Sequence, residues 1–167
     1  MSDANGTAVV ESDSAVAESP DSSVDFTATA SGGSDVRQAI HGLNNVDSDF
    51  YSTVTANTFA EKLALAKAIN DSTPLDEALG EVFNLDQYIV QAVDIVDGQS
   101  GEVVTAPRVT LISDAGKAYH GTSKGLLTSI RNLNATVGDR SNWDGPIPIQ
   151  VVKAGIRPRA YFTIKFV

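Results

Sequence analysis

Apolar residues recur at a helical period in residues 58–70. This segment opens with Thr58 and has Glu61 three positions later, the spacing at which a hydroxyl and a carboxylate bond each other's free backbone amides. Four apolar residues then follow at roughly the helical repeat: Phe59, Leu63, Ala66 and Ile69. The pattern predicts a helix with these four side chains on one face.

A weaker helical signal follows in residues 72–80. Thr73 can cap this helix, Pro74 suits its first position, and Gly80 can end it. From residue 82 onward the sequence is rich in β-branched and aromatic residues and is broken by turn signals, which is typical of strands. Five strands are predicted: 82–96, 103–113, 117–122, 147–154 and 160–167.

One further helix is predicted between the third and fourth strands. Ser123 can cap residues 124–137, and Gly138 can end them. Its apolar face consists of Leu126, Ile130, Leu133 and Val137. The order β-β-β-α-β-β is typical of an OB-fold, a five-stranded antiparallel barrel with one helix between strands three and four. The predicted class is mainly β with helices, and an open α+β sheet remains an alternative because the sequence does not show strand order.

The first 36 residues differ in composition from the rest. They consist mostly of Ser, Asp, Ala, Thr, Gly and Val, with Phe26 as their only aromatic residue. Such a segment cannot offset an ordering cost of about 1–2 kcal/mol per residue. We therefore predict a disordered acidic tail over residues 1–36, a helical N-terminal extension over 37–81 and the OB-fold domain over 82–167. Residues 37–56 are either an ordered arm or further linker.

Charge is segregated along the chain. The whole protein has 12 Lys+Arg and 21 Asp+Glu, a net charge of −9. Residues 1–36 hold seven acidic residues and no Lys or Arg, and residues 37–104 have a net charge of −8. Residues 105–167 hold nine basic and three acidic residues, a net charge of +6. The last third of the chain is therefore basic although the protein is acidic.

Several kinds of chemistry are absent from the sequence. There is no Cys, which excludes disulfides, thiolate nucleophiles and Cys-ligated zinc, and the two histidines have no ligand spacing. Asp114, His120 and Ser123 are the residue types of a catalytic triad, but Asp114 falls in a turn and Ser123 is explained as a helix cap. We expect no enzyme, cofactor or metal site. Without a signal-peptide pattern or a membrane-length apolar run, we expect a cytoplasmic protein.

Two tyrosines stand beside basic residues in the last third of the chain. Lys117 and Tyr119 are two apart in one strand and so share a face, as do Tyr161 and Lys165 in the last strand. Cations beside exposed rings suit a single-stranded nucleic acid, because phosphates meet the cations and bases stack on the rings at roughly 1–3 kcal/mol per base. This pattern favours nucleic-acid binding.

Structural interpretations compete for the same residues. Tyr119 and Tyr161 can be half-buried residues of a sheet. Trp143 can plug one end of the barrel instead of stacking on a base. Lys124 and Arg131 can simply lie on the solvated face of the helix.

The chain resembles the single-stranded DNA-binding proteins of phages and conjugative plasmids of Gram-positive bacteria in the stretches PRVTLISDAGKAYHGTSKGLLTSIRNL, Trp143 with GPIPIQVV, and FTIKFV. The likeness covers about residues 57–167. It implies an OB-fold that coats single-stranded DNA during replication or transfer in a bacterial host cell. The residues carried over by position are Arg108, Lys117, Tyr119 and Lys124, with Lys153, Arg157 and Arg159. Tyr161 joins them from the strand spacing.

The predicted function is binding of single-stranded DNA, largely independent of sequence, which protects the strand. RNA as a second ligand, a homo-oligomer or cooperative assembly on DNA, and contacts with replication or transfer proteins remain open; no membrane partner is expected. Two rival functions are an OB-fold protein-interaction module in a phage or conjugation complex and a virion structural protein. Cellular single-strand binders usually have their acidic tail at the C-terminus, whereas residues 1–36 precede the barrel. We hypothesise that they compete with DNA for its basic face; a solubilising tail is the alternative.

Overall fold

The computed structural model describes residues 32–44, 49–98, 100–156 and 160–167. The helices are α1 (Gly32–Asn44), α2 (Phe59–Asn70) and α3 (Lys124–Val137), with two short 3-10 helices, η1 (Leu75–Ala78) and η2 (Arg140–Asn142). The strands are β1 (Phe50–Ser52), β2 (Thr73–Pro74), β3 (Val82–Val96), β4 (Val103–Ser113), β5 (Ala118–Thr122), β6 (Ile147–Ala154) and β7 (Tyr161–Phe166). Residues 1–31 of the predicted tail, and Arg157 and Arg159, lie outside the described residues.

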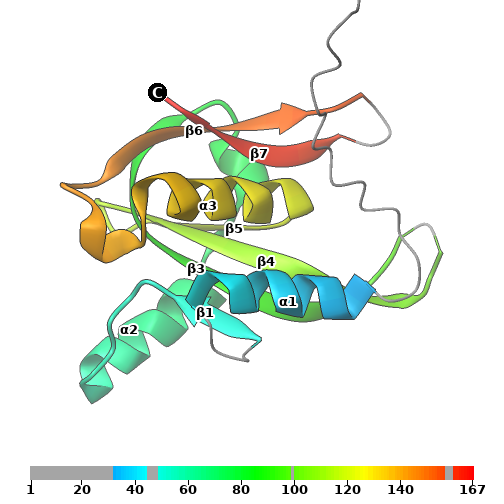
Figure 1. The fold of residues 1–167 in the computed structure, drawn as a ribbon, viewed down its shortest axis with the longest axis horizontal. Helices are drawn as coiled ribbons and strands as arrows, with labels where there is room; N and C mark the ends of the chain where they lie inside the picture. The colour runs from blue at the N-terminus through cyan, green and yellow to red at the C-terminus, as the bar shows by residue number, and fades with distance from the viewer. Residues whose placement is uncertain (1–31, 45–48, 99, 157–159) are drawn as a thin grey trace, which may run out of the picture.

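The described strands form one curled sheet in the order β2-β5-β4-β3-β6-β7, with β1 paired to β3 (Figure 1). All pairs are antiparallel except β2 with β5. The long strand β3 has two partners on one edge, because its start pairs with β6 and residues Ile89–Gln91 pair with β1. Between these stretches the register with β4 shifts from Leu85 to Gln87, an irregularity that bends a strand.

The sheet stays open because, among the described strands, β5 and β7 are not paired with each other. Side chains of α3 and its cap bond the outer edge of β7 instead. Ser123 Oγ donates to the backbone oxygen of Phe162 at 2.9 Å, and the backbone N–H of Ile164 donates to Ser129 Oγ at 3.2 Å. The fold is therefore mainly β with helices, with a curled open sheet that is compatible with an OB-like fold.

The sheet has more strands than the sequence predicted. All five predicted strands are present, and the helix between the third and fourth of them is α3. The prediction of five strands is wrong because the N-terminal extension adds β1 and β2. These segments are three and two residues long, too short to show a strand period, and their pairing with β3 and β5 depends on the tertiary fold.

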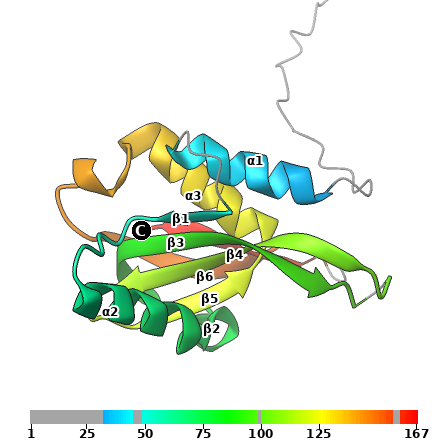
Figure 2. The ribbon, with the colours of Figure 1, turned by 90° about the horizontal axis from the view of Figure 1, so that it is seen from below.

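The main core lies between one face of the sheet and helices α1 and α3 (Figure 2). At one end of this core the Tyr88 ring packs near Tyr51 and Trp143, with centroid distances of 5.7 and 6.2 Å. Trp143 is only 7% exposed, and its Nε1 donates to the backbone oxygen of Gly138. Trp143 is therefore buried in the core, as its structural interpretation expected, and it is not displayed as a platform for bases.

Helix α1 begins inside the segment predicted as tail. Its residues Val36 and Ile40 are buried in the main core, and Arg37 Nε lies 2.8 Å from Asp49 Oδ1. The predicted boundary at residue 36 thus falls within a helix, because two aliphatic side chains in a polar segment bury enough surface to order it. Of the two interpretations of residues 37–56, the described part is an ordered arm made of α1 and β1.

Helix α2 is present with its capping box, in which Thr58 Oγ1 accepts from the Glu61 N–H and the Glu61 carboxylate accepts from the Thr58 N–H. The predicted apolar face packs only at Ile69, which is half-buried together with Leu65 and Ala68. Its other members are exposed: Phe59 by 81%, Leu63 by 56%, and also Ala66.

The weaker helix predicted for residues 72–80 is reduced to the single turn η1. Pro74 has an extended backbone with ψ 138° and pairs with β5, so no longer helix can start at Thr73. Leu75 and Ala78, within η1, are buried.

Candidate nucleic-acid interface

β7 approaches the start of α3, which brings two predicted site residues near each other in the fold. Lys124 is the first residue of α3 and Tyr161 the first of β7. A Cβ atom on Gly125 would lie 2.4 Å from Tyr161 Cδ2 and 2.5 Å from the Phe162 backbone oxygen, so this close approach requires glycine. The Tyr161 ring therefore lies against the first turn of α3, next to Lys124, and is 48% exposed. A half-exposed ring beside a cation and a helix N-terminus can receive a base and a phosphate.

A third predicted residue, Lys153, lies on the same hairpin. It is paired across the strands with Phe162, and its Nζ is 5.0 Å from the centroid of that ring. The same Nζ is 2.6 Å from Asp76 Oδ1, with both side chains about half exposed. The carboxylate offsets the positive charge that Lys153 presents. Arg157 and Arg159 stand between the two strands in the sequence, outside the described residues.

Arg108 binds another part of the protein. Its Nη2 donates to the backbone oxygen of Ile69 at the end of α2, at 2.8 Å, and to Ser72 Oγ at 3.3 Å. Within the described residues its Nε is buried without a hydrogen-bond partner, and so is Oε1 of its cross-strand neighbour Gln91. Arg108 thus joins α2 to the outer face of the sheet, a role that the sequence did not indicate.

Lys117 and Tyr119 line a groove of about 660 Å³ between α2 and β5. Lys67 also lines this groove, but so do three acidic residues: Asp71, Glu77 and Glu81. The Tyr119 ring packs at 5.2 Å from that of Phe83 and is half-buried, as its structural interpretation expected. With more acidic than basic residues, the groove is poorly suited to a phosphate backbone.

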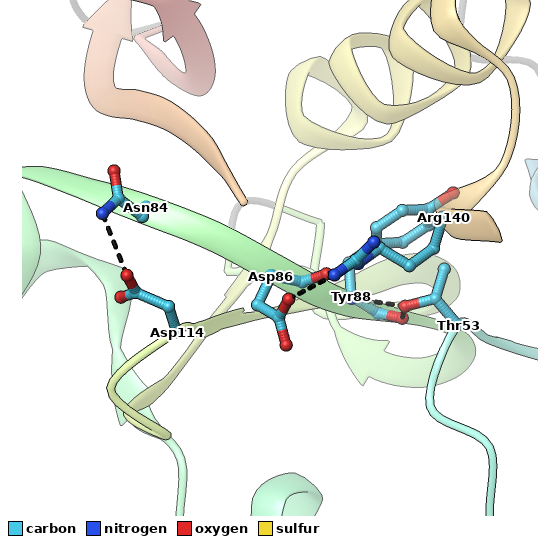
Figure 3. A network of polar contacts seen from close by, with 6 residues as sticks. All are labelled: Thr53, Asn84, Asp86, Tyr88, Asp114 and Arg140. Carbon is cyan, nitrogen blue, oxygen red and sulfur yellow. Dashed lines mark hydrogen bonds and ion pairs between the residues drawn. The ribbon is translucent and has the colours of Figure 1, made fainter. Parts of the chain in front are cut away.

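Arg140, which the sequence showed only as one of several cations, joins the loop after α3 to β3 (Figure 3). Its Nε donates to the backbone oxygen of Asp86 at 2.5 Å, and its Nη2 lies 2.6 Å from Asp86 Oδ1. Asp86 is the residue that the shifted pairing with β4 skips. The guanidinium also lies 5.4 Å from the Trp143 ring centroid. These contacts give Arg140 a structural role.

Tyr88 is held beside this network. Thr53 Oγ1 donates to its backbone oxygen at 3.1 Å and accepts from its backbone N–H at 2.8 Å. The Tyr88 hydroxyl donates to Asn134 Oδ1 at 2.6 Å. Burial raises the pKa of Tyr88, and its contact with Tyr51 raises that pKa further. The phenol therefore stays protonated and acts as a structural donor.

The three residue types of a triad make separate contacts. The Ser123 hydroxyl caps α3, Asp114 accepts from Asn84 Nδ2 at 2.9 Å, and His120 Nδ1 lies 2.9 Å from Ser72 Oγ.

Across the described ranges, no group of three or more potential ligands is placed to hold a metal ion. No described helix is long and apolar enough to cross a membrane.

The structure therefore divides the predicted site. Tyr161, at the end of the hairpin β6–β7, lies next to the start of α3, whose first residue is Lys124. Lys153 belongs to the same hairpin, but it pairs with Phe162 and so lies on the opposite strand face from Tyr161. The other described members lie elsewhere, with Lys117 and Tyr119 in the acidic groove and Arg108 against α2.

Comparison with known families identifies the chain. A family model described as "Phage Single-stranded DNA-binding protein" matches residues 44–165, well over half of the protein. No curated protein and no solved structure matches. The matched range includes β6, all of α3 and all but the last residue of β7. The chain belongs to the phage single-stranded DNA-binding protein family.

Proposed function

We propose that this protein binds single-stranded DNA through the surface formed by the start of α3 and the end of the hairpin β6–β7, which we call the hairpin site. The observation that carries the proposal is the contact of Tyr161 with the first turn of α3, next to Lys124. In this arrangement a base stacks on the exposed ring while the adjoining phosphate meets the ammonium group.

This mode of binding is largely independent of base sequence. Cations and backbone amides contact phosphates, which are the same at every position, and every base has a face that can stack. Lys153 is the weaker candidate of the two hairpin residues, because it shares a strand face with Phe162 and not with Tyr161 and because Asp76 offsets its charge. Arg157 and Arg159 remain proposed contacts from the sequence.

The biological role that we propose is protection of exposed single strands during phage replication or plasmid transfer, in the cytoplasm of a bacterial host cell. Stacking and charge pairing require no cofactor and no catalysis. Because neither interaction depends on the sugar, RNA remains a competing ligand, and the 2′-hydroxyl is the group that would distinguish the two.

Fluorescence-polarisation titrations test the site. Labelled oligo-dT, single-stranded RNA and duplex DNA are compared at about 50 and 200 mM salt, where phosphate contacts predict a steep loss of affinity. Tyr161→Ala removes the stacking ring and is expected to weaken oligo-dT binding by about 1–3 kcal/mol. Lys124→Gln is expected to weaken it less and to reduce the salt dependence.

Lys67→Gln is the matched control, because this exposed lysine lines the acidic groove. Its affinity for oligo-dT should equal that of the wild type. If Lys67→Gln weakened binding while Tyr161→Ala did not, DNA would lie in the groove and the hairpin site would be rejected.

The acidic tail carries a second proposal, that its carboxylates compete with DNA for the hairpin site. The test removes residues 1–31, since a cut at residue 36 would remove Val36 from the core. The shortened protein should bind oligo-dT more tightly at low salt and with a steeper salt dependence. Equal affinity of the two proteins at low salt would leave the tail as a solubilising segment.

A further inference from the structure

Helix α2 carries apolar residues on both of its sides but packs on only one. Leu65, Ala68 and Ile69 are half-buried on the side that packs. Phe59 and Leu63 lie one turn apart on the other side and are 81% and 56% exposed. Two large apolar side chains side by side on the solvent side of a helix are an exposed patch of the kind that marks an interaction surface. The exposed side also carries Lys62, one residue before Leu63.

A second exposed apolar surface lies at the tip of the hairpin β3–β4. Val96 and Val103 are paired across the two strands and are 68% and 70% exposed. The acidic residues Asp94 and Glu102 flank them, and both are exposed. No Lys or Arg occurs anywhere in residues 68–107 of the sequence. The tip is therefore apolar and acidic, whereas the exposed side of α2 is apolar and carries a lysine.

These two surfaces cannot meet within one molecule. Figures 1 and 2 place α2 and the hairpin tip at opposite ends of the protein in both views. Each is complementary to the other in charge, and each presents apolar side chains to cover. A second copy of the chain supplies both features at once, so it is the occupant that the surfaces themselves specify.

We propose that the exposed side of α2 in one copy packs against the β3–β4 tip of the next copy, which aligns copies head to tail on a single strand. Such a heterologous contact does not have to close and can continue along the DNA. Two small surfaces form a weak interface, but neighbours bound to one strand have a high effective concentration. The inference rests on the proposed function, because the DNA holds the copies together.

The test compares strand lengths. Wild-type protein is titrated with an oligo-dT of about 12 nucleotides, which suits a single OB-like domain, and with one of about 60 nucleotides. We expect Leu63→Ser and Val103→Ser each to weaken binding to the long strand about tenfold, equivalent to about 1.4 kcal/mol. Both variants should bind the short strand as the wild type does. Val137→Ser is the matched control, because Val137 is an exposed aliphatic residue outside both surfaces.

Charge reversal identifies which surfaces meet. Lys62→Glu and Glu102→Lys should each reduce the affinity for the long strand, and the chain with both changes should regain most of the loss. A mixture of Leu63→Ser and Val103→Ser proteins retains one intact α2 surface and one intact tip. On the long strand it should therefore form pairs of copies, and it should not form rows of three or more. Sedimentation of the mixture with the long strand distinguishes pairs from rows.

Each other outcome is informative. If Leu63→Ser weakened binding to the long strand and Val103→Ser did not, α2 of one copy would pair with α2 of another about a two-fold axis. The head-to-tail arrangement would then be overturned. If the wild type bound both lengths with the same affinity per site, the exposed surfaces would serve a different protein. Failure of the wild type to bind even the short strand would contradict the proposed function itself.

Discussion

Two helices of similar length, α2 and α3, lie on opposite faces of the same sheet, and they are held in different ways (Figure 2). Helix α3 buries five residues: Leu126, Leu127, Ser129, Ile130 and Leu133. Helix α2 buries none. Its start is set by the local capping box at Thr58, and the bond from Arg108 joins its last turn to the sheet.

This difference separates two signals in the sequence. A capping box sets where a helix begins, because it satisfies local backbone amides. It carries no information about whether the helix is packed. Burial on one apolar face provides most of the stability of a helix in a protein, so α3 should belong to the cooperative core and α2 should open locally at lower free energy.

The largest expected difference comes from truncating matching side chains on the two helices. Ile130, in α3, is fully buried, so Ile130→Ala should lower the free energy of unfolding by about 2–5 kcal/mol. Leu65→Ala, in half-buried surroundings on α2, should cost only about 1 kcal/mol. Urea denaturation measures both. Equal losses would show that α2 belongs to the same cooperative unit as α3.

A smaller effect is expected from adding one methyl group to α3. Gly125→Ala places a Cβ atom against the Tyr161 ring and a backbone oxygen, and overpacking of this kind costs about 1–3 kcal/mol. Gly42→Ala is the control: this helical position of α1 has open space around it, so the exchange should stabilise by about 0.5–1 kcal/mol. Thermal unfolding measures both changes. If Gly125→Ala left the stability unchanged, α3 would be able to move away from β7 without loss of stability.

Much of this architecture was predictable from local patterns. The spacing of Leu126, Ile130 and Leu133 identified the buried face of α3, because a strong helical period of apolar residues reflects a single packed face. Val137, the fourth predicted member, is wrong: at the end of the helix it is 44% exposed. In α2 the apolar residues lie all round, so the sequence could not show which face packs. The strands β1 and β2 were missed because their pairing is a tertiary event.

The candidate site was less predictable than the fold. Residue types and strand spacing selected the cations but could not show which of them meet acidic partners. Lys153 meets Asp76, a residue 77 positions away, and Arg108 meets the end of α2. Only the close approach at Gly125 placed Tyr161 next to Lys124, and a glycine in the first turn of a helix was the one sequence signal available for it.

Arg108→Met tests how α2 is fixed at its C-terminal end, with a moderate expected effect. Methionine keeps the apolar stem but removes the donors to Ile69 and Ser72. The free energy of local opening of α2 should therefore fall by about 1 kcal/mol. Native-state hydrogen exchange of the α2 amides measures this, while those of α3 serve as the internal control. Were Arg108 a DNA contact, as the sequence suggested, oligo-dT affinity would fall while α2 exchange stayed unchanged.

The smallest effect is expected at the other end of α2, from pH. The backbone N–H groups of Thr58 and Asn57 bond the Glu61 carboxylate and lower its pKa below 4.5. A carboxylate with a lowered pKa in the folded state stabilises above its ordinary pKa and loses that contribution as the pH falls through the lowered value. The first amides of α2 should therefore become better protected from hydrogen exchange as the pH rises from 3 to about 5, once the rates are corrected for intrinsic exchange. In Glu61→Gln this dependence should disappear, whereas the first turn of α3, which Ser123 caps and no acidic residue joins, should show none in either protein. A pH dependence that persisted in Glu61→Gln would assign the change to the whole protein and not to the cap of α2.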